Sequence, residues 1–101
     1  MKMTREQITG AHAEVPSINL GIERLRLFSD ALDKFYLEGG QAVLRLSDSH
    51  KDQKFEEFEK EFDSFFPSLL EFRKKNDEYA KYLEDRVRFI ENEHNAIVFG
   101  Q

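Results

Sequence analysis

The sequence contains no cysteine and no tryptophan, only two prolines, and no long uninterrupted run of apolar residues. Without cysteine the chain has no disulfide framework and no thiol nucleophile. The same absence fits a reducing cytoplasm and a secreted bacterial protein without disulfides equally well. No apolar stretch reaches the roughly 18–20 residues of a membrane span, and the opening residues MKMTREQITG lack the apolar core of a cleavable signal. We therefore expect no membrane span and a location that is either cytoplasmic or secreted without a cleaved signal peptide.

Positive charge is also in short supply. Fifteen lysines and arginines face twenty acidic residues, which gives a net charge of −5. A phosphate backbone would be repelled on average, and the one basic run, residues 73–75, has acidic residues on both sides. We expect no nucleic-acid partner.

Residues that could carry chemistry are few and scattered. His12, His50 and His94 show no zinc-ligand spacing, and no glycine-rich phosphate loop is present. Glu91 and His94 have the E-x-x-H spacing of di-iron helical bundles, but such a site needs a second pair, which only a symmetric dimer could supply here. We predict a protein that is not an enzyme, with no catalytic residues, no metal and no cofactor.

Helical periodicity is the strongest signal in the chain, because apolar residues recur at intervals of three and four, which places them on one face of a helix. One such stripe consists of Ile18, Ile22, Leu25, Phe28, Leu32, Phe35, Ala42 and Leu46. The other consists of Phe55, Phe58, Phe62, Phe65, Leu69, Phe72, Tyr79, Leu83 and Ile90. The polar residues 47–52 between the stripes favour a turn. We predict an all-α fold: an antiparallel two-helix hairpin over residues 17–94, with its turn at 47–52.

The ends of the hairpin follow from capping signals. We expect residues 1–16 to be an extension, partly helical or flexible, in which Thr4 and Gln7 form a capping box for one short turn. Ser17 is expected to cap the first long helix, since it directly follows Pro16. At the other end, Asn95 is expected to cap the second helix, leaving residues 95–101 as a tail that docks on a neighbour or stays disordered.

Four further positions interrupt the two stripes. Gly39 and Gly40 weaken the first helix and predict a kink or a close helix crossing, with a functional hinge as the alternative. In the second helix, Pro67 predicts a kink at residues 63–67, and Asn76 replaces an apolar seam residue, a substitution that typically fixes register or partner choice.

Ser49, His50, Lys51 and Asp52 occupy the predicted turn, and Ser49 and Asp52 also have capping-box spacing. With this turn near the middle of two long helices, the chain over roughly residues 17–94 resembles the WXG-type family of small helical-hairpin proteins associated with type VII secretion. His50 stands where the family has tryptophan, and Asp52 stands where it has glycine or aspartate. Phe89 and Glu93 match the spacing of the family's C-terminal secretion signal, with phenylalanine in place of tyrosine. The resemblance implies dimers that form four-helix bundles, no cofactor, and roles as secreted effectors or adaptors that contact a secretion machinery.

The apolar residues of both helices are more numerous than a single seam can cover, which predicts association. We expect a homodimer, or a pairing with a related hairpin, that forms a four-helix bundle. The predicted interface consists of Phe28, Phe35, Phe66, Tyr82 and Phe89. Function is then that of a protein–protein interaction module of the WXG type, and the alternative is a cytoplasmic immunity- or antitoxin-like protein that binds a basic partner.

Overall fold

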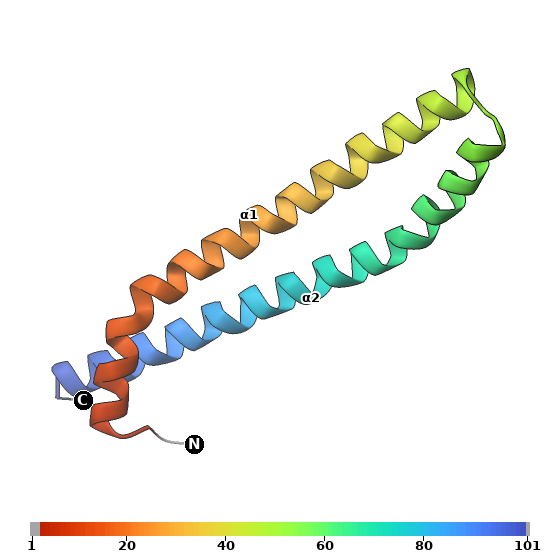
Figure 1. Ribbon diagram of the computed structural model, residues 1–101. Helices are drawn as coiled ribbons and strands as arrows, with labels where there is room; N and C mark the ends of the chain where they lie inside the picture. The colour runs from red at the N-terminus through yellow and green to blue at the C-terminus, as the bar shows by residue number, and fades with distance from the viewer. Residues whose placement is uncertain (1–2, 101) are drawn as a thin grey trace. The chain divides into compact units, whose positions relative to one another are not determined.

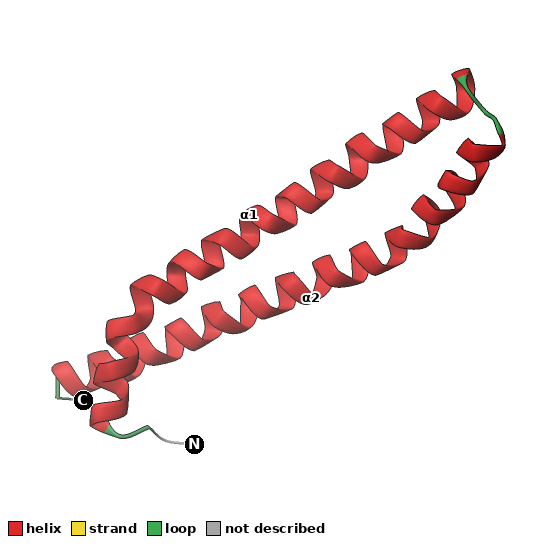
Figure 2. Cartoon of the chain, in the orientation of Figure 1, coloured by secondary structure: helices red, strands yellow, loops and turns green. Residues whose placement is uncertain are grey.

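The computed structural model describes residues 3–100 and consists of two long helices joined by a short turn (Figures 1 and 2). Helix α1 comprises Arg5–Ser49 and helix α2 comprises Gln53–Val98. No strand occurs in residues 3–100. The predicted all-helical hairpin is confirmed.

Two compact units make up the chain, and each contains a segment of both helices. The terminal unit comprises Met1–Arg26 and Glu78–Gln101, and the turn unit comprises Leu27–Asp77. In the terminal unit, His12 stacks on His94 and Arg26 pairs with Glu84. Later residues of α1 therefore meet earlier residues of α2, so the helices are antiparallel.

In both units, buried and half-buried residues recur at steps of three and four residues or sums of these steps, and we call this line of residues the seam. On α2 the seam includes Phe62, Phe66, Leu69, Asn76, Ala80, Leu83, Val87 and Ile90; on α1 it includes Ile8, Val15, Ile22, Ser29, Leu32 and Val43. All of these side chains are buried or half-buried. This spacing keeps one side of a helix against a partner, so mutual burial holds the two helices together.

Helix α1 begins earlier than predicted. The capping box at Thr4 forms: the Gln7 amide donates to Thr4 Oγ1 over 3.2 Å, and the Thr4 amide donates to Gln7 Oε1 over 2.8 Å. The helix then continues through Pro16, so the prediction that Ser17 caps its start is wrong. The physical reason is tertiary, because Ile8 and Val15 are buried in this segment and their burial opposes the break that a proline favours.

The turn lies within the predicted range but is shorter, since only residues 50–52 are outside the helices. Asp52 caps α2 by accepting a hydrogen bond from the Phe55 amide over 2.8 Å. The predicted capping box between Ser49 and Asp52 is wrong, because the Ser49 hydroxyl donates to the Arg45 carbonyl of its own helix over 2.8 Å. His50 Nε2 lies 3.4 Å from Asp52 Oδ2.

The end of α2 also extends beyond its prediction. The helix passes Asn95, which accepts from the Phe99 amide through its backbone carbonyl, and ends at Val98. Gly100, with φ +70°, then takes the left-handed conformation that glycine favours after a helix. Asn95 is therefore not the cap, and residues 95–98 belong to the helix because half-buried Ala96 and Ile97 continue its packed side.

Both helices are continuous at their predicted weak points. Helix α2 runs through Pro67, and its ribbon bends in the green segment that precedes this proline (Figure 1). Helix α1 runs through Gly39 and Gly40. A β-carbon at Gly39 would lie 3.2 Å from Cζ of Phe62, whereas one at Gly40 would meet no atom within 4 Å. The close crossing predicted at this pair is thus made at Gly39 alone.

This difference predicts that an alanine substitution stabilises the protein more at Gly40 than at Gly39. We expect Gly40→Ala to raise the free energy of unfolding by about 1 kcal/mol, the helix-propensity gain of alanine over glycine. The same change at Gly39 should gain clearly less, because Phe62 must shift and its ring is already held by Phe66 at 4.3 Å between centroids. Urea unfolding of the two single variants measures the difference. Equal gains would show that the Phe62 contact does not constrain Gly39.

Candidate functional site

Aromatic rings form a second column on α2, beside the seam. Phe58, Phe65 and Phe72 follow each other at intervals of seven residues, so they lie along one flank of the helix. Phe28 and Phe35 have the same spacing on α1. All five rings are between 44% and 55% exposed, which is unusual for phenylalanine.

The two columns belong to one surface of the turn unit. Phe28 of α1 and Phe72 of α2 meet edge to face, with ring centroids 5.8 Å apart. In an antiparallel helix pair, equivalent flanks of the two helices lie on the same side of the seam. We call Phe28, Phe35, Phe58, Phe65 and Phe72 the aromatic face. An exposed apolar surface of this kind typically marks an interaction site.

Charged residues of both signs border the aromatic face. Glu38, Glu61 and Lys75 each follow a ring of the face by three residues, and Lys54 precedes Phe58 by four, so each lies one turn from a ring. All four are exposed. Arg24, also exposed, precedes Phe28 by four residues, so the border carries two acids and three bases and offers both signs of charge to a partner.

Further aromatic rings of the turn unit pack in the seam, and one of them contacts the aromatic face. Phe66 lies in the seam, half-buried, with its ring centroid 4.5 Å from Tyr36 and 4.3 Å from Phe62. Phe62 in turn stacks on Phe58 at 5.9 Å. Phe66, predicted as a dimer residue, thus packs within its own chain.

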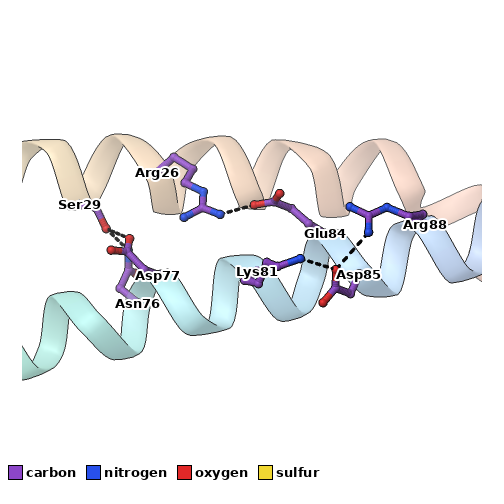
Figure 3. Close-up of polar contacts among 8 residues, drawn as sticks. All are labelled: Arg26, Ser29, Asn76, Asp77, Lys81, Glu84, Asp85 and Arg88. Atoms are coloured by element: carbon purple, nitrogen blue, oxygen red, sulfur yellow. Dashed lines mark hydrogen bonds and ion pairs between the residues drawn. The ribbon is translucent and has the colours of Figure 1, made fainter.

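A polar network crosses the seam in the same unit. The Ser29 hydroxyl donates a hydrogen bond to Asp77 Oδ1 over 2.5 Å and accepts one from the side-chain amide Nδ2 of Asn76 over 2.8 Å (Figure 3). Arg73 contacts both carboxylate oxygens of Asp33, with Nε at 2.6 Å, and its Nη1 lies 3.4 Å from Asp77. Asn76 therefore does bond across the seam, as expected of a residue that fixes register.

The other predicted interface residues lie in the terminal unit. Tyr82 is exposed and stacks on Tyr79 at 6.0 Å, while Phe89 lies under the Arg86 guanidinium at 5.8 Å. The seven-residue spacing of Phe58, Phe65 and Phe72 continues to Tyr79 and Arg86, so neither Tyr82 nor Phe89 belongs to the register of the aromatic face. Phe89 and Glu93 lie one turn apart on α2, and Glu93 is half-buried.

The histidines are arranged in a way that their spacing did not predict. His12 and His94 stack with ring centroids 3.6 Å apart and an angle of 4° between their planes. Among residues 3–100, no group of three or more His, Asp or Glu side chains is placed to hold a metal ion. Antiparallel helices bring residues close together that are far apart in sequence, and no local motif predicts such a pair.

In the terminal unit, the side-chain carboxyl of Asp85 has a lowered pKa. A hydrogen bond from Lys81 Nζ, 2.8 Å long, lowers the pKa of Asp85; partial desolvation opposes it, and the charges of Lys81 and Arg88 add to it (Figure 3). A lowered folded-state pKa stabilises the fold above the ordinary carboxylate range, and this contribution is lost as pH falls through the lowered value. We expect Lys81→Ala to raise the pKa of Asp85 towards 3.8, as measured by NMR titration of its side-chain carboxyl. An unchanged titration would contradict the assigned hydrogen bond.

Comparison of the chain with protein-family models, characterised proteins and solved structures finds no match. Neither helix contains, within the described residues, an apolar stretch long enough to cross a membrane.

Proposed function

We propose that the protein is a non-enzymatic interaction module that pairs with a second copy of itself through the aromatic face, giving a four-helix bundle. The observation that supports this most directly is the set of five half-exposed phenylalanines on one side of the turn unit. Among the described residues, the terminal unit has five buried apolar side chains, including the contiguous core of Val15, Val87 and Ile90, whereas the turn unit has three. A partner that covers the aromatic face would therefore stabilise the turn unit more than the terminal unit.

The size of the aromatic face is sufficient for association. A phenylalanine ring buries about 150–250 Å², so five half-exposed rings offer roughly 500 Å² on each copy, more than half of the about 800 Å² that each partner contributes to a standard interface. Covering the rings of both copies corresponds to roughly 25 kcal/mol of gross transfer free energy, compared with about 4–15 kcal/mol for lost translational and rotational freedom.

The charged residues that border the aromatic face are also compatible with a second copy of the chain as the partner. Two-fold pairing brings the same surface of each chain together, so the face must be complementary to itself. A border with both Glu38 and Glu61 and both Lys54 and Lys75 meets that condition, because the acids of one copy can approach the bases of the other.

The WXG resemblance gives this pairing a biological context. Dimeric hairpins of that type are secreted effectors or adaptors of type VII-like secretion, and we carry that role over as part of the proposal. Phe89 and Glu93 would then belong to the secretion signal. A second candidate, an immunity- or antitoxin-like protein, is favoured by the acidic stretch 56–63, in which five acids surround Lys60.

Sedimentation equilibrium from low to high micromolar concentration tests the proposal. One chain has a mass of 11.9 kDa, and we expect the weight-average mass to rise to twice that value. A protein that stays monomeric at high micromolar concentration would overturn self-association and leave a different protein as the partner.

A further inference from the structure

A groove lies on the other side of the seam in the turn unit. Its volume is about 360 Å³, and its apolar lining includes Tyr36, Leu37, Leu44 and Phe62. Gly40 leaves one wall open, since a β-carbon there would meet no atom within 4 Å. We call this the Gly40 groove.

The Gly40 groove is separate from the aromatic face. Gly40 follows Phe35 by five residues, and Asp63 of the groove follows Phe58 by five. Five residues correspond to a rotation of about 140° around an α-helix. Gly40 and Asp63 therefore lie on the opposite side of the seam from the rings of the aromatic face. Phe62, which lines the groove, lies between the two surfaces and contacts Phe58. The openings of the two surfaces face different sides, so both can be occupied at once.

The charge at the groove has one sign. Glu59 and Asp63 line it, and no lysine or arginine does. Within residues 3–100, neither acid takes part in an ion pair. Glu56, one helical turn before Glu59, extends the acidic side towards the turn, and Lys60 lies outside the lining. A second copy seated here would place acid against acid, whereas a cationic partner would gain Coulomb energy.

We propose that the Gly40 groove binds the apolar side of a cationic amphipathic helix belonging to a different protein. One large apolar side chain of that helix would enter beside Gly40, and lysines or arginines next to it would pair with Glu59 and Asp63. This inference goes beyond self-association and shares with the proposed function only the premise that the surface of the turn unit serves protein contacts.

The probe is a fluorescein-labelled amphipathic helix of leucine and lysine with one central phenylalanine, followed by fluorescence anisotropy. A second peptide carries glutamate in place of every lysine. Gly40→Leu fills the groove without removing any contact and should raise the Kd of the lysine peptide at least about tenfold. Gly21→Leu is the matched control, because a β-carbon at Gly21 likewise meets nothing within 4 Å and the site lies outside the turn unit. We expect it to change the Kd by less than about twofold.

Charge is tested by a second matched pair of variants. Glu59→Gln with Asp63→Asn should weaken the lysine peptide and flatten the salt dependence of its Kd, whereas Glu14→Gln with Glu23→Gln, the same charge change on exposed residues of the terminal unit, should do neither. Circular dichroism confirms that each variant stays helical.

Three outcomes would overturn the inference: no binding of the lysine peptide, equal binding of the glutamate peptide, or equal effects of Gly40→Leu and Gly21→Leu. Sedimentation of the same samples separates this result from the proposed function. A dimer that binds no lysine peptide refutes the groove alone, and a monomer that binds it at Gly40 refutes self-association alone.

Discussion

Replacing Phe35 and Phe65 by serine is expected to convert the proposed dimer into a monomer. Both rings are about half exposed, one on each helix of the aromatic face. Each exposes roughly 100 Å², so the four rings lost from a dimer remove on the order of 10 kcal/mol of gross transfer free energy. If about 4 kcal/mol of this is realised, the Kd rises about a thousandfold. Sedimentation equilibrium measures the change.

The same double variant should remain folded. Neither Phe35 nor Phe65 makes a ring contact within the described residues, so the hairpin loses little internal packing. We expect the free energy of unfolding of the isolated chain to change by about 1 kcal/mol or less. Phe66→Ser should behave in the opposite way, because it removes a half-buried ring from contact with Tyr36 and Phe62.

Tyr82→Ser with Phe89→Ser is the matched control, since these residues were predicted for the interface but do not belong to the aromatic face. We expect this variant to remain dimeric. If it dissociates while the Phe35 and Phe65 variant keeps its dimer mass, the interface lies in the terminal unit and our assignment of the aromatic face is refuted.

The periodicity of the sequence predicts the helices and the place of the turn, because three- and four-residue spacing leaves few other structures open. It does not show which side faces inward. Phe58, Phe62, Phe65, Leu69 and Phe72 satisfy the same rule, although in the structure Phe62 and Leu69 lie in the seam and the other three beside it. Asn76 and Ala80 continue the seam with a polar and a small residue, which hides it from a search for large apolar side chains.

The ends of the helices depend on tertiary contacts that local signals do not contain. Pro16 and Ser17 predict a helix start, but burial of Ile8 and Val15 keeps the preceding residues helical. The Gly40 groove was also missed for a related reason. Two adjacent glycines indicate weakness in a helix, and only the position of Phe62 against Gly39 shows that Gly40 is the open one.

The second large effect is expected at Ser29 and Asn76, which are 3% and 8% exposed. Ser29→Ala removes the acceptor of the Asn76 amide and the donor to Asp77. Such a change in a buried network costs about 1–3 kcal/mol, which lowers the Tm by roughly 4–8 °C per kcal/mol in a domain of this size. Ser64→Ala is the control, because its hydroxyl is exposed and, among residues 3–100, bonds only to the carbonyl of Glu61 in the same helix. The effect should therefore stay within about 0.5 kcal/mol.

The double variant Ser29→Ala with Asn76→Leu separates stability from specificity. Replacing both polar partners by apolar groups removes the donor together with its acceptor, so we expect the free energy of unfolding to return to within about 1 kcal/mol of the original. A buried amide in a helical seam specifies register and partner number, and its loss should allow several arrangements of the helices. Sedimentation should then show mixed association states, and backbone NMR spectra should show more than one peak for residues near position 76. If the double variant is less stable than either single variant and still gives one species, the polar network stabilises the seam without selecting its register.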